Sequence, residues 1–545
     1  MELARPGRRG RAAATVAAFA VLLFAPSVSG LLATGSPAGL AALPFESLAV
    51  LLVLVAVPWR PLRWAVAVLF GSFVVGVTAL AALDLGFRFT VDRAFIAASD
   101  WRQVADAYGV LSDGVGPVSA LILVALIVAV AAGGVAGMAW AALRASDEVR
   151  DRGRRGLAVL TTATVVWMTG AAIGAQVMPG VPLAAAPAID TVTATAVRSI
   201  DAVREQALFE RAQRSDPFRH IPSDRLLTAL AGKDVVIAFI ESYGQVAVQG
   251  TSFSEGVARV LREGDEQLAR DGYSARSAFV TSPSFGGVSW LPHATLQSGL
   301  WVDSQLKYDQ LTTTDRFTLS RAFGAAGWRT VSHVPSNHGP WPVGTSFYGY
   351  DALVDAGDVG YRGPSFGYAR IPDQYTWQHF YDRELAEPHP PVMAEIDFVS
   401  SHTPWTPLPK LVPWSQLGDG SIFHAHAAEG VPAAEVWGDS REVQRLYGES
   451  IEYSLGAMLS FLQTYDPPGL VLIVVGDHQP ARIVSGPDAT AEVPISIIAK
   501  DPAVFDHIAS WGWDAGIHPS PDAPAWRMDE FRDRFLRAFG PEDDR

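Results

Sequence analysis

Four long apolar segments without a charged residue, all within the first 189 residues, restrict the fold of this chain more than any other feature. They cover 12–45, 64–83, 114–143 and 156–189. A helix crosses the hydrocarbon core of a bilayer with about 20 apolar residues. Pro26 and the small residues of 34–37 break the first segment, so we read one span before this stretch and a second span after it. We therefore predict an N-terminal helical membrane domain at 1–179 with about five transmembrane helices, near 12–32, 40–58, 64–84, 117–142 and 157–178.

The arginines around these segments indicate how the membrane domain is oriented. Four arginines precede the first span, two lie at 60–63 and five lie at 144–155, whereas 33–39 has none and the long loop 84–113 has three. Cytoplasmic loops carry the excess of Lys and Arg. We therefore expect a multi-pass protein of the cytoplasmic membrane with its N-terminus in the cytosol. An odd number of spans makes the C-terminal part extracytoplasmic, and Glu46 in the second span is expected at the outer interface.

The C-terminal part differs in composition from the first part. Residues 180–545 contain 28 basic and 46 acidic residues. Binding to nucleic acid depends on Lys and Arg that meet phosphates, so we expect no nucleic-acid partner. The chain contains no Cys, which excludes disulfides, thiolate metal ligands and a Cys nucleophile.

Short apolar runs alternate with helical patterns from residue 215 onward, after a predicted linker helix at 180–214. The runs are 234–240, 328–334, 392–399, 470–475 and 492–499, and the helical stretches include 254–270, 315–327 and 442–465. Uninterrupted buried strands that alternate with helices are typical of a mainly parallel sheet with helices on both faces. We predict one α/β domain at 215–545.

Polar residues follow three of these runs. Glu241 follows 234–240, Asp477 and His478 follow 470–475, and His402 follows 392–399 in the sequence SSHTPW. In open α/β sheets, ligands bind beyond the carboxyl ends of the strands. Two carboxylates and an imidazole suit Mn²⁺, Mg²⁺ or Zn²⁺. For each residue alone, the alternative is a strand end that meets water or caps a turn.

Ser289 stands at the expected start of a helix, behind Gly286 and Gly287. The glycines allow a tight turn of the backbone. A Ser at this position either caps the helix or acts as a nucleophile activated by a metal, and one residue can do both. His293, one helical turn further, either faces the same site or has a surface or packing role, and these interpretations stay open.

These motifs, in this order and spacing, resemble the alkaline-phosphatase/sulfatase superfamily. About five spans before an extracytoplasmic domain look like its lipoteichoic acid synthase branch, the membrane phosphoglycerol transferases. The resemblance implies an alkaline-phosphatase-like fold and one divalent metal ion, with Mn²⁺ expected and Mg²⁺ or Zn²⁺ as alternatives. It assigns the metal to Glu241, Ser289, Asp477 and His478.

The resemblance also implies substrate contacts, and here the chain departs from the branch. His402 and Trp341, the latter in NHGPWP, match substrate-site residues, and Asn337 is a further candidate because it follows the run 328–334. The branch has Thr where this chain has Ser289, and it has an Arg that grips the phosphate where this chain has Val343. A true sulfatase is not expected, because the residues after Ser289 do not form the C/S-x-P-x-R motif.

The function implied is a membrane-anchored, metal-dependent phosphotransferase. It would move a phosphoglycerol-like head group from a membrane phospholipid to an envelope glycan or glycolipid through a phospho-Ser289 intermediate. His402 would protonate a leaving oxygen or bind the phosphate. Two alternatives stay open: an extracytoplasmic phosphodiesterase or sulfatase-like hydrolase, and a non-catalytic membrane scaffold with a degenerate sulfatase-like domain. A transporter is disfavoured because the spans contain few polar groups.

Overall fold

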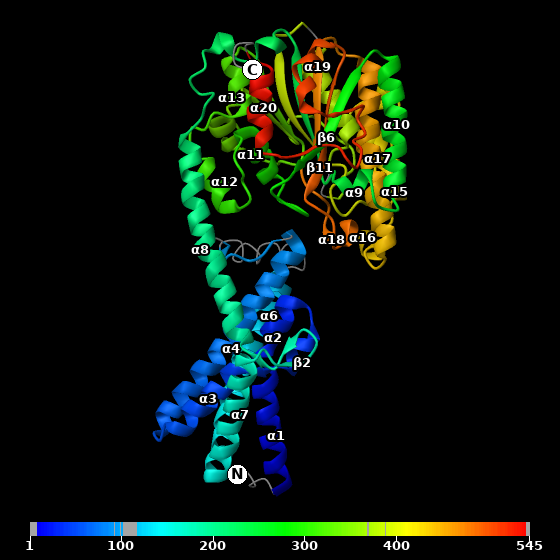
Figure 1. Cartoon of the computed structure of the whole chain (residues 1–545). Helices are drawn as coiled ribbons and strands as arrows, with labels where there is room; N and C mark the ends of the chain where they lie inside the picture. Colours follow the sequence, from blue (N-terminus) through cyan, green and yellow to red (C-terminus); the bar gives the residue numbers. More distant parts are fainter. Residues whose placement is uncertain are drawn as a thin grey trace. The chain divides into compact units, whose positions relative to one another are not determined.

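The computed structural model describes residues 8–91, 93–98, 100–101, 117–367, 370–386 and 388–540, and the chain divides into two compact units (Figure 1). The helical unit comprises Met1–Phe89 and Arg93–Glu205. The α/β unit comprises Thr90–Asp92 and Gln206–Arg545.

The helices of the helical unit coincide with the apolar segments of the sequence. They are α1 (Arg8–Phe24), α2 (Ser27–Thr34), α3 (Phe45–Ala56), α4 (Arg60–Val91), α6 (Pro117–Asp151) and α7 (Arg154–Ala172), and α8 (Pro187–Arg214) begins in this unit. Within the described residues, α4 and α6 each contain a stretch long and apolar enough to cross a membrane. α1 and α2 are long and apolar enough only when they are taken together as one broken span, which would be the third. The two helices meet at an angle of 42°, and Pro26 lies between them.

The predicted spans near 64–84 and 117–142 are therefore confirmed as long apolar helices, whereas five transmembrane helices are not confirmed. α3 has 12 residues, which is short for a span. α7 has 19 residues, and its two leading arginines and its threonines lower its hydropathy. Glu46, at the start of α3, accepts hydrogen bonds at Oε1 from the backbone N–H groups of Ala188 and Ile189, at 2.9 and 3.0 Å. It thus caps the first turn of α8, where a carboxylate is favourable.

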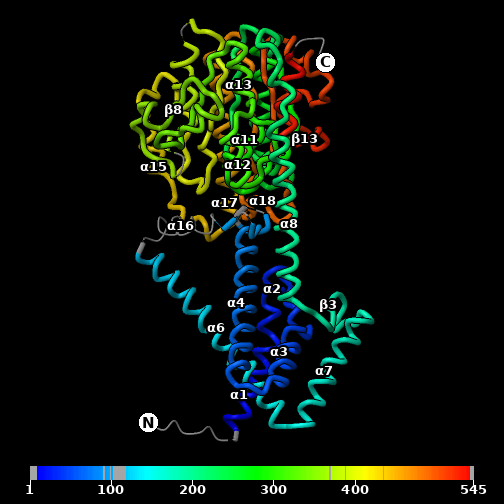
Figure 2. Tube along the Cα trace, turned by 90° about the vertical axis from the view of Figure 1, so that its left-hand side faces the viewer, coloured from blue at the N-terminus to red at the C-terminus, as the bar shows by residue number. Residues whose placement is uncertain are grey.

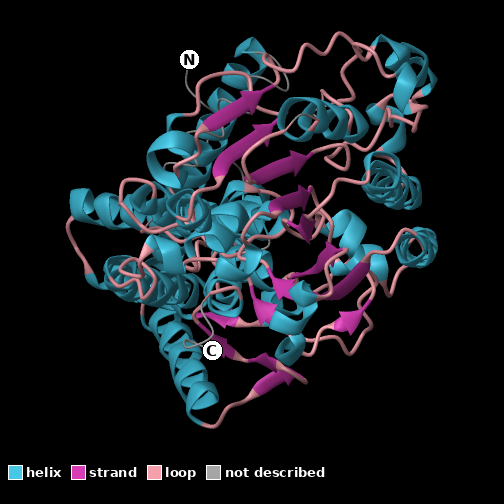
Figure 3. Cartoon of the chain, turned by 90° about the horizontal axis from the view of Figure 1, so that it is seen from above, coloured by secondary structure: helices cyan, strands magenta, loops and turns pink. Residues whose placement is uncertain are grey.

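A nine-stranded sheet forms the centre of the α/β unit (Figure 3). Its strands are β5 (Asp234–Ile240), β6 (Ser274–Thr281), β7 (Arg329–Val334), β8 (Ala352–Asp355), β9 (Val392–Phe398), β10 (Leu470–Gly476), β11 (Glu492–Ala499), β12 (Asp514–Ala515) and β13 (Ala525–Arg527). The order is β12-β6-β11-β10-β5-β9-β7-β8, with β13 beside β6. The five strands predicted from apolar runs are confirmed as β5, β7, β9, β10 and β11, and the long strand β6 and the short strands β8, β12 and β13 were missed.

The sheet is mixed, and the prediction of a mainly parallel sheet holds for its central strands. β10, β5, β9, β7 and β8 run parallel in that order. β11 pairs antiparallel with both β10 and β6, and the two-residue strand β12 pairs antiparallel with β6. The connection from β10 to β11 contains only the short helix α18 (Arg482–Ser485), whereas a parallel crossover needs a dozen or more residues and usually a long helix.

Helices cover both faces of the sheet, as predicted (Figure 1). One face carries α10 (Ser254–Arg270), α14 (Asp373–Phe380) and α17 (Ser440–Tyr465); the other carries α11 (Trp290–Ser298), α13 (Leu319–Ala325) and α20 (Glu530–Ala538). The side chains of β5 alternate between the two faces, because successive residues of a strand point to opposite sides. Val235, Ile237 and Phe239 join the core under α11, and Val236, Ala238 and Ile240 join the core under α17.

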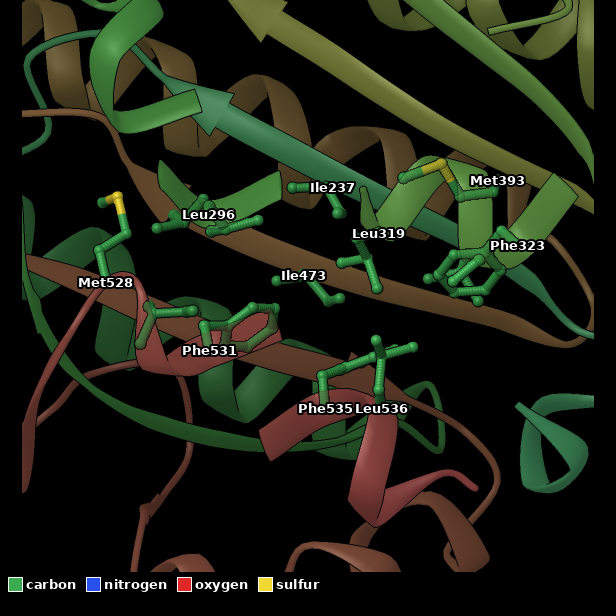
Figure 4. Packing of buried hydrophobic residues seen from close by; sticks show 14 of the residues in the cluster. Ile237, Leu296, Leu319, Phe323, Met393, Ile473, Met528, Phe531, Phe535 and Leu536 are labelled. Carbon is green, nitrogen blue, oxygen red and sulfur yellow. The ribbon is translucent and has the colours of Figure 1, made fainter. Parts of the chain in front are cut away.

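The packing of α11 on the sheet fixes the position of the residues at its start. Figure 4 shows Leu296 of α11 beside Ile237 of β5 and Ile473 of β10, with Phe531 and Phe535 of α20 close by. Figure 2 shows α11 with α12 (Gln305–Leu311) and α13 beside it, and these helices contact one another. The N-terminus of α11 is therefore held rigidly at the end of the central strands.

Candidate metal and catalytic site

The pairing of two central strands brings the predicted metal ligands together. β5 and β10 are parallel neighbours, and Ile240 lies opposite Gly476. Glu241 and Asp477 are the next residues along the chain, so both carboxylates leave the sheet at the same edge. This is the edge at which ligands bind in open α/β sheets.

Side chains of Glu241, Asp477 and His478 converge at this edge. One potential ligand atom from each lies within 4.8 Å of the others, and all three residues are buried. His478 Nε2 is 3.4 Å from both Glu241 Oε1 and Asp477 Oδ2. Ser289 Oγ donates a hydrogen bond to Glu241 Oε2 at 3.0 Å and lies 3.3 Å from His478 Nε2. Two carboxylates, an imidazole and a hydroxyl fit a divalent cation.

Backbone groups hold the ligand atoms of Asp477 and His478 in place. His478 Nδ1 donates to the carbonyl oxygen of Gln479 at 2.9 Å, which leaves the Nε2 lone pair for a metal. Asp477 Oδ1 accepts from the N–H groups of Ser242 and His478, at 2.7 and 2.6 Å, and Oδ2 faces the other ligands. The site is thus oriented by its own main chain.

The two buried carboxylates of this site differ in their ionisation. Burial and the neighbouring Glu241 raise the pKa of Asp477 to about 6. Burial also opposes ionisation of Glu241, but His478 and His402 outweigh it and lower the pKa of that carboxyl. A bound cation would allow both carboxylates to be charged.

The backbone around Ser289 explains why its hydroxyl reaches the metal ligands. Gly286, Gly287 and Val288 have φ angles of 72°, 154° and 68°, and Val288 is the strained one because only Gly adopts such angles readily. Ser289 is the N-cap residue of α11 by position, yet its side chain makes no capping hydrogen bond. The hydroxyl points at Glu241 and His478 instead. Of the two roles predicted for Ser289, its contacts fit the one next to the metal ligands.

A cavity of about 420 Å³ opens in front of Ser289 and brings the predicted substrate residues together. Asn337, Trp341 and His402 all line it, together with Ser289 and the carboxylates of Glu241 and Asp477. Val343, which stands where an Arg was expected, packs against the core. None of the described residues that line the cavity is Lys or Arg.

His402 is held by the loop that follows β9. Its Nδ1 donates to the carbonyl oxygen of Thr403 at 2.6 Å, which directs Nε2 away from the main chain. Ser401 Oγ donates to the carbonyl oxygen of Glu241 at 2.6 Å, and Trp405 Nε1 donates to the carbonyl oxygen of Ser401 at 2.7 Å. The loop is therefore tied to Glu241, the first of the predicted metal ligands.

The cavity also contains three titratable residues that the sequence analysis missed or left open: His293, Glu395 and Asp397. We call them the second cluster. His293 Nδ1 lies 2.9 Å from Glu395 Oε1 and 3.5 Å from Asp397 Oδ1, so His293 faces the site. Burial alone would lower the pKa of His293, but Asp397 and Glu395 outweigh it and raise it to about 9.

The sequence contained a signal for Glu395 and Asp397, because both are carboxylates within the otherwise apolar run 392–399. The prediction of site residues rested on the residues that follow each run and so did not include them.

Asp373 is a further residue that the sequence did not reveal, and it anchors the loop of His402. Its Oδ1 accepts from the backbone N–H of Ser400 at 2.9 Å, and its Oδ2 accepts from Ser454 Oγ at 2.6 Å. Asp373 is fully buried, and burial raises its pKa to about 6. Its charge is therefore unfavourable in the folded state.

We expect Asp373→Asn to remove a pH dependence of stability. An acid whose pKa is higher in the folded state stabilises the fold below its unfolded pKa of about 4, and this contribution is lost as the pH rises through about 6. Between about pH 4 and about pH 7 the variant should gain on the order of 3 kcal/mol relative to the wild type. Thermal unfolding of both proteins in detergent, followed by Trp fluorescence across this range, measures the difference. A difference that does not change with pH would contradict the prediction.

Comparison with known proteins gives similarity in structure only. No protein-family model matches the chain, and no curated protein matches it. Among solved structures, it is similar to the lipoteichoic acid synthase LtaP from Listeria monocytogenes, with 12% identity over 58% of this chain and 74% of that chain and a TM-score of 0.35. It is also similar to the integral membrane protein lipooligosaccharide phosphoethanolamine transferase A (EptA) from Neisseria meningitidis, with 14% identity over 97% of this chain and 95% of that chain and a TM-score of 0.45.

A third similar structure is the Streptococcus pyogenes phosphoglycerol transferase GacH in complex with sn-glycerol-1-phosphate, with 12% identity over 62% of this chain and 90% of that chain and a TM-score of 0.35. The neighbours thus include a lipoteichoic acid synthase, the kind of protein that the sequence motifs resemble. Identities of 12–14% and TM-scores below 0.5 leave the chemistry of this chain to be inferred from its own residues.

Proposed function

We propose that this chain is a membrane-anchored, metal-dependent phosphotransferase that acts outside the cytoplasmic membrane. The observation that carries the proposal is the convergence of Ser289 Oγ with Glu241, Asp477 and His478 at the wall of a cavity. A hydroxyl at a helix N-terminus, next to a donor set that fits a divalent cation, is equipped to attack phosphorus.

The donor we propose is a membrane phospholipid, with a phosphoglycerol-like head group as the moiety transferred. Residues 1–179 would anchor the chain in the membrane with about five spans. Residues 180–214 would form a helix that links this anchor to the extracytoplasmic catalytic domain at 215–545. The apolar stretches of α4 and α6 support a membrane anchor. Anchoring keeps the catalytic domain close to lipid, which favours a lipid donor over a soluble one.

The reaction proceeds in two displacements. Ser289 Oγ forms a bond to phosphorus and releases its proton towards Glu241, and the bond between phosphorus and the lipid alcohol breaks. His402 protonates the leaving oxygen, so that diacylglycerol departs and the head group stays on Ser289 as a phosphodiester. A hydroxyl of an envelope glycan or glycolipid then attacks phosphorus and gives its proton to His402, and the bond to Ser289 breaks as Oγ regains the proton held at Glu241.

The metal we propose at Glu241, Ser289, Asp477 and His478 is Mn²⁺, with Mg²⁺ and Zn²⁺ as alternatives. When bound, such a cation stabilises negative charge on the Ser289 oxygen and on the non-bridging phosphoryl oxygens. The protein residues bind the substrate: Trp341 and Asn337 line the cavity beside Ser289 and are placed to contact the head group.

The test uses the full-length protein in detergent with Mn²⁺ and phosphatidylglycerol that carries a fluorescent acyl chain. We expect release of fluorescent diacylglycerol, and a head-group mass on the peptide that contains Ser289 when no acceptor is present. Parallel reactions with phosphatidylethanolamine compare head groups, and metal-free protein is the control. Free glycerol phosphate as the main product would favour a hydrolase, and bound metal without cleavage of either lipid would reject the lipid donor.

We expect His402→Gln to lower kcat for phosphatidylglycerol by roughly 10²- to 10³-fold, because the leaving alcohol would depart without a proton. A p-nitrophenyl phosphodiester needs no protonation of its leaving group, so the same variant should lose about tenfold or less with it. The comparison of the two substrates measures the role of His402 as an acid. His424→Gln is the matched control, because His424 is exposed and does not line the cavity. Equal losses with both substrates would instead indicate that His402 binds the phosphate.

A further inference from the structure

The second cluster has the geometry of a ligand set. His293 Nδ1, a Glu395 oxygen and an Asp397 oxygen all lie within 4.8 Å of one another, and each residue lines the same cavity as Ser289. His293 and Glu395 are buried, and Asp397 is partly buried. One imidazole and two carboxylates again fit a divalent cation.

The surrounding residues hold the cluster in position. The ring of His293 stacks on Phe239 with centroids 3.7 Å apart. Glu395 Oε2 accepts from Tyr350 OH at 3.0 Å and from Gln297 Nε2, so the carboxylate presents Oε1 to His293. Contacts that orient a ligand in this way are typical of metal sites.

Asp397 supplies an independent sign of a missing partner. Its Oδ1 is buried and has no hydrogen-bond partner among the described residues. This same atom lies 3.5 Å from His293 Nδ1. The oxygen therefore has an ion pair with a protonated His293 but accepts no hydrogen bond, which is costly for a buried carboxylate oxygen, and a cation within the cluster would remove that cost.

The carboxylates of the cavity and a bound phosphodiester together carry more negative charge than one metal ion and a protonated His293 balance. Four carboxylates line it, from Glu241, Glu395, Asp397 and Asp477. No described lining residue is Lys or Arg, and Val343 packs against the core instead. One divalent cation balances two of these carboxylates, a protonated His293 balances a third, and a phosphodiester adds another negative charge. A second cation would make such a cavity able to bind an anionic substrate.

We propose that His293, Glu395 and Asp397 hold a second divalent cation in the same cavity. It would bind the phosphoryl oxygens of the substrate and so replace the cationic side chain that is absent at Val343. The binding of the cation rests on the second cluster alone, whereas its role towards phosphate rests on the proposed function. Protein side chains supply three ligands, and water or substrate oxygens complete the coordination.

The test measures bound Mn²⁺ on the full-length protein in detergent, by mass spectrometry of the metal after removal of free ion and by electron paramagnetic resonance. We expect about two Mn²⁺ per chain in the wild type, with the spectrum of two magnetically coupled ions. Asp397→Asn should retain about one uncoupled Mn²⁺, and Glu241→Gln should also retain about one. Asp488→Asn, which changes an exposed carboxylate of similar chemistry, should behave as the wild type.

Each outcome decides the proposal. About one Mn²⁺ in the wild type would overturn it and leave a protonated His293 as the partner of the two carboxylates. Two ions in both the wild type and Asp397→Asn would place the second ion elsewhere. If Asp397→Asn does not show a cooperative unfolding transition, Glu395→Gln provides the same comparison. A stoichiometry of about two without cleavage of any lipid would uphold the second site and reject the proposed function.

Discussion

Ser289→Ala is expected to lower kcat for head-group release by at least about 10³-fold, because the attacking oxygen is removed and water would have to take its place. The hydroxyl contacts both Glu241 and His478, which are the residues best placed to accept its proton and to hold the metal beside it. The backbone strain at Val288 indicates that the turn is shaped to place this one side chain. Release of fluorescent diacylglycerol measures the effect.

The control for this prediction comes from the same turn. Ser284 is buried, and its hydroxyl has no hydrogen-bond partner among the described residues, so Ser284→Ala removes the same atom without touching the metal ligands. We expect this variant to retain wild-type kcat within about threefold. Ser289→Thr should retain measurable activity, because it keeps the hydroxyl. A kcat of the Ser289→Ala variant that is a tenth or more of the wild-type value would exclude Ser289 as the nucleophile.

Asp477→Asn is expected to abolish activity and the stabilisation that comes from metal bound between Glu241, Asp477 and His478. One carboxylate oxygen of Asp477 faces the other proposed ligands, and the other oxygen accepts hydrogen bonds from two backbone N–H groups. Asparagine can still accept those hydrogen bonds, but it offers no negative charge to a divalent cation. Mn²⁺ bound between Glu241, Asp477 and His478, at about 100 times its dissociation constant for these residues, should stabilise the wild type by about 2.7 kcal/mol. Asp477→Asn should lose this contribution and keep only that of an ion at the second cluster.

Thermal unfolding with Mn²⁺ and with a chelator measures this difference. The wild type should unfold at a temperature several degrees higher with Mn²⁺ than with the chelator, since about 1 kcal/mol shifts the midpoint of a large domain by roughly 2–4 °C. Asp488→Asn is again the matched control, because it removes an exposed carboxylate outside the cavity. An equal gain in Asp477→Asn and in the wild type would show that the ion does not bind between Glu241, Asp477 and His478.

The strands of the α/β unit could be predicted because their sequences are unusual in a simple way. A run such as 234–240 is apolar at every position, and only a strand buried on both faces by helices accommodates that pattern. β6 was not predicted, because Ser274, Arg276 and Ser277 interrupt its apolar residues. Its pairing with β11 and β13 decides its conformation. In the helical unit, apolar composition identified α4 and α6, but composition does not show how much of a shorter apolar segment becomes one continuous helix.

The sequence by itself determined that Glu241, Asp477 and His478 lie at one edge of the sheet, because they follow recognisable strands and parallel strands end at a common edge. Only the tertiary structure decided that Ser289 points at these residues, that Val343 packs against the core, and that His293 joins Glu395 and Asp397. The reason is physical. The direction of a strand end follows from local periodicity, whereas a side chain on a turn or within a strand finds its partner only when distant segments pack together.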